Sequence, residues 1–458
     1  MKATLSVIMS RQDERSLNGL LFTDDGLENA AFAVCGYART TQGTTLLVRK
    51  ILAVPLEAYV ERTAFHLEVS PAFINQVVDE AEGKLAILVM HSHPGGAYGR
   101  YSPSDDHGEA RLFKVFEELV PGAPHASLLF TQGSVIGRTW EKGRFREVRR
   151  VKATGPELIE LSRDGKSDSK GGEIMFYDRQ VAAFGRQMQS RLSSMTVGIV
   201  GLGGTGSAVC EQLARIGVSG FVLIDPDRFE ASNLSRTYGT ERRDAKSRPF
   251  KVSVAHDNIL RINPGAEIVA IQGTVVSQST LEKLRDCDVV FGCTDTDWSR
   301  SVLNRFAYQY LVPVIDMGVR IVVGDGKIAA AGGRVSMIGP GLPCLWCTHH
   351  LDSERIRVES MSDRERTKLL REKYIKGLEV RAPSVISLNS TLASLAVTML
   401  LSAISGLSEV PSSAPEHIYD VVDGTIFRSR GRPDQGCKVC GPDSIQGMGD
   451  LQVVSAYP

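Results

Sequence analysis

The stretch VGIVGLGGTGSAVCEQLARIG, residues 197–217, decides the fold of the C-terminal part of the chain. An apolar strand runs into the glycine-rich turn Gly201–Gly206, and an amphipathic helix follows at once. Glycines let the backbone approach a phosphate closely, and the N-terminus of a helix offers N–H donors and a favourable dipole. The next strand ends in Asp225, roughly twenty residues on, where a carboxylate usually accepts from a ribose hydroxyl. The stretch therefore predicts a nucleotide site.

The pattern on either side of this stretch divides the chain in two. Downstream, short apolar runs alternate with amphipathic helical stretches, which predicts a doubly wound, mostly parallel α/β sheet. Its strands are expected at residues 197–201, 221–225, 267–273, 288–293 and 312–318. Upstream the pattern is α+β, with strands expected at residues 31–37, 45–54, 85–90 and 127–130 and a helix at residues 71–83. A polar, Gly/Ser-rich segment separates the halves, so we predict domains at residues 1–155 and 173–458 and a linker at 156–172.

Composition narrows the class of protein. The chain has 458 residues, of which 42% are hydrophobic, and its Lys+Arg and Asp+Glu counts are both 53. This balance gives no bulk electrostatic reason to expect a nucleic-acid or membrane partner. The N-terminus reaches charged residues before an apolar core of signal-peptide length, so a cytoplasmic location is expected. Residues 392–407 are apolar but interrupted by hydroxyl side chains, and they are short of the roughly 20 residues that span a bilayer, which predicts a buried helix.

Five residues outside the turn favour transfer of a nucleotidyl group. The turn and its carboxylate alone fit an NAD-dependent dehydrogenase equally well. In chain order the further residues are Arg179, Asn233, Arg236, Lys251 and Asp295. Three cations around one nucleotide suit a triphosphate with a leaving pyrophosphate, and an aspartate after a strand can hold magnesium. Together, in this order, they resemble the ThiF-type family, which includes ubiquitin-activating enzymes and the adenylyltransferases of thiamine and molybdopterin synthesis. The resemblance spans roughly residues 174–442.

The resemblance implies roles for the glycine turn. Gly203 and Gly206 would cradle the phosphates of ATP, with Gly201 and Gly204 completing the turn, and Asp225 would bind the ribose. It also implies a reaction. The C-terminal glycine carboxylate of a ubiquitin-like protein would attack the α-phosphate in line and give an acyl-adenylate and pyrophosphate.

The resemblance implies roles for the five further residues as well. Asn233, Arg236 and Lys251 would orient the triphosphate, and Asp295 would hold Mg²⁺. Arg179 would reach the γ-phosphate; in homodimeric relatives the corresponding arginine crosses from the partner subunit, so a homodimer is expected. The motif RPFKV differs from the commoner form by one extra residue between the proline and Lys251, which leaves the reach of this lysine open.

A second cluster follows the apolar strand at residues 85–90. The sequence HSHPGGAYGRYSPSDD at residues 91–106 places His91 and His93 on the same side of a strand end, and Asp105 follows a Gly-rich loop. Three such ligands leave the fourth position of a zinc ion open for water, which a hydrolytic zinc requires. The string His91-Ser92-His93-Pro94, seven residues, Ser102, two residues and Asp105 resembles the signature of the JAMM (JAB1/MPN) metalloproteases.

That resemblance implies an N-terminal JAMM fold with a catalytic Zn²⁺ held by the two histidines and Asp105. Ser102 would lie near the oxyanion of the tetrahedral intermediate. An upstream glutamate would take the proton from the zinc-bound water and pass it to the leaving amine; our candidate is Glu28, with Glu57 and Glu61 as alternatives. The family cleaves isopeptide or peptide bonds that follow ubiquitin-like tails, and some bacterial members process sulfur-carrier proteins.

Four of the eight cysteines form two CxxC pairs, Cys344/Cys347 and Cys437/Cys440. Two such pairs can close a tetrahedral structural zinc site, and a redox role for either pair is the competing interpretation. The remaining cysteines, at positions 35, 210, 287 and 293, lie in apolar contexts where free thiols are common.

Ubiquitin-activating enzymes that form a thioester carry a cysteine between the two zinc pairs, and here residues 348–436 contain none. The acyl group is therefore expected not to rest on a crossover cysteine of this chain. Cys293 is the nearest candidate elsewhere, although we interpret it as strand packing. Residues 355–381, rich in Arg, Glu and Lys, are expected to form a mobile helical crossover.

Both halves point to one class of substrate. We predict a bifunctional enzyme in which the adenylyltransferase activates a ubiquitin-like protein and the JAMM domain trims its precursor or removes it from targets. The modifier would be supplied in trans, because the chain ends in SAYP, and a separate conjugating enzyme could take the activated protein. Three alternatives stay open: sulfur-carrier activation that ends in a thiocarboxylate, a non-catalytic scaffold, and a dehydrogenase that retains NAD.

Overall fold

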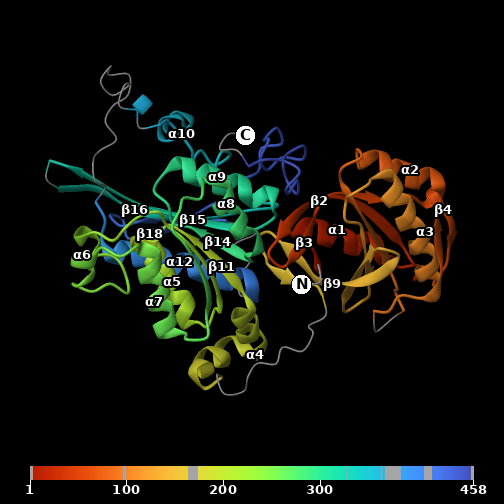
Figure 1. The fold of residues 1–458 in the computed structure, drawn as a ribbon, viewed down its shortest axis with the longest axis horizontal. Helices are drawn as coiled ribbons and strands as arrows, with labels where there is room; N and C mark the ends of the chain where they lie inside the picture. Colours follow the sequence, from red (N-terminus) through yellow and green to blue (C-terminus); the bar gives the residue numbers. More distant parts are fainter. Residues whose placement is uncertain are drawn as a thin grey trace. The chain divides into compact units, whose positions relative to one another are not determined.

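The structure is a computed structural model that describes residues 4–95, 99–162, 174–325, 327–362, 364–366, 383–406 and 415–454. The chain divides into two compact units (Figure 1). Unit 1 contains residues 1–167, 308–311 and 445–453, and unit 2 contains residues 168–307, 312–444 and 454–458. Each unit has its own sheet and is described by itself.

Unit 1 is built on a sheet whose strand order closes on itself. The order is β1-β3-β2-β6-β7-β8-β9-β10, and β1 also pairs in parallel with β9. A separate two-stranded sheet joins β4 and β5. The strands are β1 (Thr4–Ser10), β2 (Ala30–Thr40), β3 (Gly43–Ala53), β4 (Tyr59–Arg62), β5 (Leu67–Val69), β6 (Ala86–Ser92), β7 (Ala126–Phe130), β8 (Val135–Glu141), β9 (Arg144–Thr154) and β10 (Ile159–Glu160). The helices are α1 (Arg11–Leu21), α2 (Pro71–Glu80) and α3 (Pro103–Leu119), with a 3₁₀ turn η1 (Leu56–Ala58).

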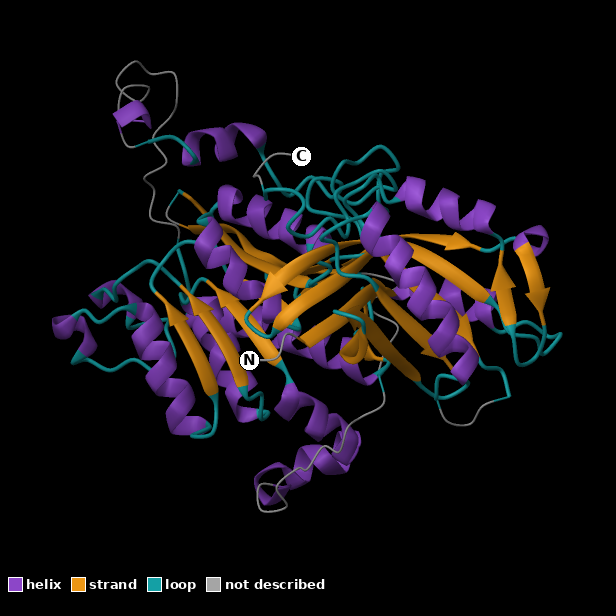
Figure 2. Ribbon diagram, turned by 45° about the vertical axis from the view of Figure 1, so that its right-hand side comes forward, coloured by secondary structure: helices purple, strands orange, loops and turns teal. Residues whose placement is uncertain are grey.

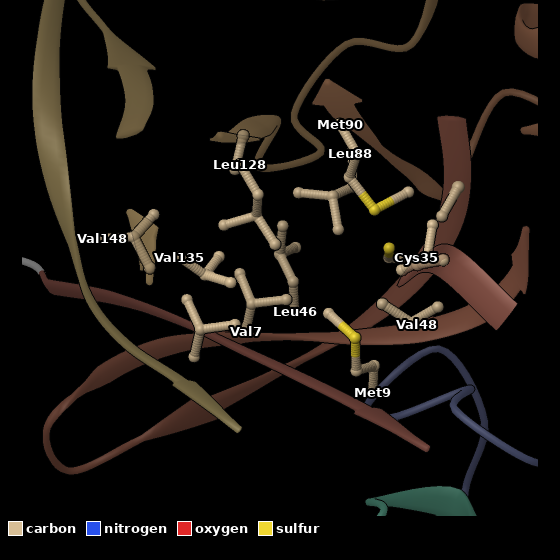
Figure 3. Close-up of a cluster of buried hydrophobic side chains, with 14 of the residues drawn as sticks. Val7, Met9, Cys35, Leu46, Val48, Leu88, Met90, Leu128, Val135 and Val148 are labelled. Carbon is tan, nitrogen blue, oxygen red and sulfur yellow. The ribbon is translucent and has the colours of Figure 1, made fainter. Parts of the chain in front are cut away.

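Alternating side chains of the strands fill two hydrophobic clusters. In β2, Ala31, Ala33 and Cys35 belong to one cluster, and Phe32 and Val34 belong to the other, as the two-residue period of a strand requires. Figure 3 shows the first cluster, where side chains of several strands meet. The second cluster receives α2 and α3 through Phe73, Phe113 and Phe116. Burial on both faces explains why these strands are apolar along most of their length.

The predicted strands and the helix of the N-terminal half are confirmed as β2, β3, β6, β7 and α2. The predicted linker begins too early: Ile159–Glu160 form β10 and pair with β9, so the sheet continues beyond residue 155. Residues 163–172 of the predicted linker lie outside the described residues. The boundaries also miss that residues 308–311 and 445–453 group with unit 1, because long-range contacts leave no local signal.

Unit 2 contains the doubly wound sheet in the order β13-β12-β11-β14-β15-β16-β17-β18. The pairings from β13 to β15 are parallel and those from β15 to β18 are antiparallel. All five predicted strands are present, and the antiparallel extension was not predicted. The strands are β11 (Thr196–Val200), β12 (Gly220–Ile224), β13 (Glu267–Ile271), β14 (Val289–Gly292), β15 (Val314–Gly324), β16 (Lys327–Ile338), β17 (Glu416–Asp420) and β18 (Thr425–Ser429).

Helices lie on both faces of this sheet (Figure 2), with α5 and α7 on one side and α9 on the other (Figure 1). The helices are α4 (Asp178–Ser194), α5 (Gly204–Arg215), α6 (Asp244–Ser247), α7 (Lys251–Ile262), α8 (Gln278–Leu281), α9 (Asp297–Gln309), α10 (Ser353–Glu359) and α12 (Ile386–Ser405). Short 3₁₀ turns are η2 (Ile174–Tyr177), η3 (Ala231–Asn233) and η4 (Glu282–Asp286).

The apolar stretch at residues 392–407 lies mainly in α12, which packs on α5, β15 and β16. Among the described residues, α12 is the only helix that is both long enough and apolar enough to cross a bilayer. Half of its most apolar stretch is already buried inside the protein. The buried side chains include Leu392, Val397 and Leu400. This is the arrangement of a core helix, as predicted.

Candidate functional site

The glycine turn lies where β11 ends and α5 begins, and its glycines differ in their surroundings. Gly201 has a φ of +90°, and a Cβ there would lie 2.6 Å from the carbonyl oxygen of Cys293. A Cβ on Gly206 would lie 1.8 Å from the oxygen of Gly201, and one on Gly204 2.0 Å from Asn389 Nδ2. Around Gly203 there is open space to 4 Å. Three glycines therefore keep the turn compact, and Gly203 leaves room for a ligand at the N-terminus of α5.

Asp225 follows β12 and is tied to the turn. Its side chain is buried and accepts hydrogen bonds from the backbone N–H of Leu202 at 2.7 Å and of Asp227 at 2.8 Å. Burial raises the pKa of this carboxyl. Lys251 Nζ lies 3.9 Å from Asp225 Oδ1 and donates to Asp227 Oδ2 at 2.7 Å. The extra residue in RPFKV therefore does not remove Lys251, which is the first residue of α7, from the glycine turn.

The other predicted nucleotide residues lie around this core at different depths. Asn233 is buried in η3, where its Oδ1 accepts from the N–H of Glu230 at 2.9 Å. The side chain of Arg236 donates to the oxygen of Ser232 at 2.7 Å, and its own carbonyl oxygen would contact a Cβ on Gly204 at 3.4 Å. The structure thus brings Arg236 to the turn through its backbone.

Asp295 and Arg179 are both exposed. Asp295 lies in the loop after β14, and two residues earlier the carbonyl of Cys293 packs against Gly201, so this loop borders the turn. Arg179 is the second residue of α4. Within the described part of the chain, no hydrogen bond or ion pair connects it to the turn, and its role across a subunit interface stays a prediction.

Asn389 of α12 also lies at the glycine turn, and it was not among the predicted site residues. Its Nδ2 donates to Ser384 Oγ at 3.0 Å and lies over Gly204. A buried amide in an otherwise apolar helix was the available signal, since buried polar groups are usually placed for a partner. A second missed feature is the attachment of α10: Glu359 Oε2 accepts from the N–H of Trp298 at 2.8 Å, just after the loop that carries Asp295.

In unit 1 the three predicted zinc ligands converge. One ligand atom each of His91, His93 and Asp105 lies within 4.8 Å of the others. The Nε2 atoms of His91 and His93 are each 3.5 Å from an oxygen of Asp105, and ligands of a tetrahedral zinc with bonds near 2.0–2.1 Å stand about 3.3 Å apart. His91 Nε2 is also buried and has no hydrogen-bond partner among the described residues. This donor set fits a zinc ion.

Glu28 and Ser102 border the same three ligands. Glu28 is buried, burial raises its pKa, and its Oε1 lies 3.4 Å from His93 Nε2. The alternatives Glu57 and Glu61 are both exposed. Ser102 is the N-cap of α3: its Oγ accepts from the N–H of Asp105 at 3.1 Å, and Asp105 Oδ2 accepts from the N–H of Ser102 at 2.6 Å. This capping box aims the carboxylate of Asp105 toward the histidines.

The four cysteines of the CxxC pairs form one cluster in unit 2. Cys344 Sγ lies 3.7 Å from Cys347 Sγ and 3.7 Å from Cys437 Sγ, and Cys347 Sγ lies 3.5 Å from Cys440 Sγ. The edge of a tetrahedron with Zn–S bonds near 2.3 Å is about 3.8 Å. Because sulfurs of both pairs approach one another equally, the arrangement suits one metal ion better than two independent redox pairs.

Cys293 and the crossover segment were also considered in the sequence, and the structure describes the first fully and the second in part. Cys293 is a half-buried residue whose thiol has its pKa raised to about 12, mainly by burial, so it is a poor nucleophile at neutral pH. In the crossover, residues 353–359 form α10. Residues 363 and 367–381 of that segment lie outside the described residues.

Comparisons with known proteins identify the family of the C-terminal part of the chain. The model of the ThiF family matches residues 177–439. The molybdopterin-synthase adenylyltransferase of Escherichia coli (strain K12) is 29% identical over 273 residues, which cover 59% of this chain and 97% of that protein. The sulfur carrier protein ThiS adenylyltransferase of Bacillus subtilis (strain 168) is 27% identical over 174 residues, or 37% of this chain and 49% of that protein.

Two further similarities are partial. The adenylyltransferase and sulfurtransferase MOCS3 of Drosophila yakuba is 34% identical over 181 residues, which cover 39% of this chain and 37% of that protein. Among solved structures, E. coli MccB with AMPCPP and MccA has a TM-score of 0.46 and 20% identity over 61% of this chain and 76% of that one. Because the family match covers more than half of the sequence and includes the glycine turn, this chain belongs to the ThiF family and carries a ThiF-type adenylyltransferase domain at residues 177–439.

Proposed function

We propose that unit 2 activates the C-terminal glycine carboxylate of a ubiquitin-like protein as an acyl-adenylate. One observation carries this proposal: the open side of Gly203 lies at the start of α5, on the turn that Asp225 and Lys251 border. There the N–H groups of α5 would bind phosphate oxygens, and Asp225 would accept from the ribose hydroxyl.

In this proposal the carboxylate oxygen of the protein tail attacks the α-phosphorus of ATP. A new O–P bond forms, the bond from the α-phosphorus to the bridging oxygen breaks, and pyrophosphate leaves with that electron pair. Lys251 and Arg236 would offset the charge that grows on the leaving group. A magnesium ion held by the exposed Asp295 would supply further neutralisation of the phosphates.

A second function is proposed for unit 1, where the convergence of His91, His93 and Asp105 beside the buried Glu28 favours hydrolysis. A zinc ion on these ligands would supply a water of lowered pKa. The carboxylate of Glu28 would take a proton from this water on one of its oxygens and deliver it to the leaving amine nitrogen. Ser102, the residue that caps α3, would lie near the oxyanion.

The two activities would act on one class of substrate. Hydrolysis after the terminal glycine of a ubiquitin-like protein yields the free carboxylate that adenylation consumes, or releases the protein from a target. We propose a cytoplasmic homodimer of the adenylyltransferase domain, with the modifier and a separate conjugating enzyme supplied in trans. The names of the B. subtilis and D. yakuba relatives, a sulfur carrier protein adenylyltransferase and an adenylyltransferase and sulfurtransferase, favour the alternative of sulfur-carrier activation, in which the adenylate becomes a thiocarboxylate.

Pyrophosphate exchange tests the adenylation. ATP and labelled pyrophosphate should exchange only when a glycine-terminated ubiquitin-like protein is present, and Lys251→Ala should abolish most of the exchange. The same modifier without its last glycine is the matched control. Failure to exchange with every glycine-terminated candidate would overturn the proposal.

Two measurements separate the remaining alternatives. Mass spectrometry of the modifier after reaction distinguishes a thiocarboxylate from an isopeptide-linked conjugate. A modifier extended beyond its glycine should be cut by the wild type, and His91→Ala and Glu28→Gln should both lose this cleavage while pyrophosphate exchange continues. Undiminished cleavage by His91→Ala would exclude the metal site as its source.

A further inference from the structure

Glu109 lies one helical turn after Asp105 in α3 and is buried. Its Oε2 accepts two hydrogen bonds at 2.7 Å, from Ser127 Oγ and from Arg138 Nε. Its Oε1 has no hydrogen-bond partner among the described residues and lies 3.9 Å from Nδ1 of His91. A buried carboxylate with one satisfied and one unsatisfied oxygen is costly unless the second oxygen serves a partner that arrives later.

The imidazole of His91 has the complementary deficit. Its Nε2 is buried, has no hydrogen-bond partner among the described residues and lies 3.5 Å from Asp105 Oδ1, on the side of the proposed metal. A neutral imidazole carries one N–H, so a metal at Nε2 requires the proton at Nδ1. The carboxylate oxygen Oε1 of Glu109, which has no hydrogen-bond partner within the described part of the chain, lies 3.9 Å from Nδ1. A metal on Nε2 would therefore satisfy Nε2 directly, and a small rotation of the ring would satisfy Nδ1 and Oε1 together.

The carboxylate of Glu109 is itself held in one orientation. The guanidinium of Arg138 lies 3.6 Å from the centroid of the Tyr101 ring and 3.8 Å from that of Phe145. The hydroxyl of Tyr101 donates to the backbone oxygen of Ser127 at 3.1 Å. Because Arg138 and Ser127 fix Oε2, the other oxygen faces His91 before any metal binds. The positive charge of Arg138 also offsets the cost of burying the carboxylate.

We propose that Glu109 is a positioning residue that accepts from His91 Nδ1 and so fixes the tautomer in which Nε2 is free to bind the metal. The inference rests on the proposed metal site of unit 1 and assigns Glu109 a role in it. The ion pair with Arg138 uses only Oε2 of Glu109 and leaves Oε1 toward His91.

The test measures zinc affinity of the full chain by competition with a chromogenic chelator. The isosteric Glu109→Gln variant is decisive. Ser127 and Arg138 would donate to its amide oxygen, so that its NH₂ group, which cannot accept a hydrogen bond, would face His91. Loss of a hydrogen-bond partner of a metal-binding histidine typically weakens metal binding about 10–100-fold. We expect zinc affinity at the site of unit 1 to fall by a factor in this range, while zinc at the four clustered cysteines of unit 2 is retained. Glu14→Gln is the matched control, since Glu14 is also a buried, ion-paired glutamate of unit 1, and both of its carboxylate oxygens have partners away from the metal site.

The tautomer gives a readout that a purely structural role would not move. In ¹⁵N-edited histidine spectra, zinc-loaded wild type should show a protonated Nδ1 for His91, and Glu109→Gln should lose this signal or shift it. Folded Glu109→Gln with wild-type zinc affinity and an unchanged Nδ1–H signal would overturn the inference alone. Equal zinc content in wild type and His91→Ala would instead remove the metal site, and with it both the proposed hydrolysis and the role of Glu109.

Discussion

Gly203 and Gly206 belong to the same turn but differ in the space around them. Substitutions at the two positions should therefore affect different properties, stability at Gly206 and ATP binding at Gly203. A methyl group at Gly206 would meet the backbone oxygen of Gly201 at 1.8 Å, whereas one at Gly203, with a φ of −77°, meets nothing within 4 Å. We expect Gly206→Ala to lower the stability of unit 2 by about 1–3 kcal/mol or more. Gly203→Ala should keep the wild-type melting temperature and lose ATP affinity, because its open side faces the proposed phosphates.

Differential scanning fluorimetry and isothermal titration with ATP check this pair. Each variant serves as the control of the other, since the change is the same methyl group in the same turn. Wild-type ATP affinity in Gly203→Ala would place the nucleotide elsewhere.

Glu416 predicts how the stability of unit 2 depends on pH. Burial by itself would raise its pKa, but hydrogen bonds from His350 and Ser336 and the charge of Arg334 lower it from the ordinary 4.5 to about 2. A carboxyl whose pKa is lower in the folded state stabilises the fold above its unfolded pKa and loses this contribution as the pH falls. The contribution of Glu416 should therefore be complete above pH 4.5 and disappear toward pH 2.

Urea unfolding of wild type and Glu416→Gln between pH 3 and pH 7 measures this contribution. The difference in unfolding free energy should be largest near pH 7 and should shrink below about pH 4.5. Glu267→Gln, on an exposed strand residue, is the control and should show no such trend. A difference that grows toward acid would contradict the assignment.

At the scale of the element, the start of α3 combines a helix cap with the metal site. Ser102 and Asp105 form a capping box there, and Ser10 and Asp13 form the same box at the start of α1. Loss of a capping hydroxyl costs about 1 kcal/mol, so Ser102→Ala and Ser10→Ala should destabilise unit 1 by similar amounts. Only Ser102→Ala should also reduce cleavage of an extended ubiquitin-like protein.

Chemical denaturation and a cleavage assay below the melting temperature distinguish the two roles. If both variants lose cleavage equally, Ser102 acts only through the stability of its helix. If Ser102→Ala cleaves as wild type does, the serine has no part near the oxyanion.

At the scale of the whole molecule, the end of the described chain completes unit 1. Gly449 forms a parallel bridge with Tyr37, the N–H of Asp450 donates to the oxygen of Tyr37 at 2.8 Å, and Asp450 Oδ2 accepts from the N–H of Arg39 at 2.8 Å. A Cβ on Gly36 would lie 2.1 Å from the oxygen of Gly447, so this close approach requires glycine. Residues 445–453 therefore act as a structural part of a unit that begins more than four hundred residues earlier.

Truncation after Ser444 should destabilise unit 1 by about 1 kcal/mol for each of these hydrogen bonds lost. Hydrogen exchange should show faster exchange in β2, especially at Arg39. Truncation after Val453, which keeps the segment, is the matched control and should behave as wild type. Unchanged protection of β2 without residues 445–453 would show that the segment is dispensable.

Much of this fold follows from local pattern. The predicted strands of both units and the buried helix α12 are present, because side-chain alternation and apolar runs report directly on burial. Spacing along the chain also identified His91, His93 and Asp105 and the four clustered cysteines before their atoms were seen together. Short motifs carry such sites because a strand end or a tight turn places neighbouring residues on one side.

Other features could not be predicted in this way, because they depend on contacts between residues distant in sequence. The strand β10 and the antiparallel strands β16 to β18 give weak local signals and are stabilised by their neighbours. Residue identities and spacing alone determined the family, the two candidate metal clusters and the glycine turn. Only the tertiary structure decided that Glu109 faces His91, that Asn389 covers Gly204 and that residues 445–453 belong to unit 1, since burial and hydrogen bonding at these places arise when the chain is already folded.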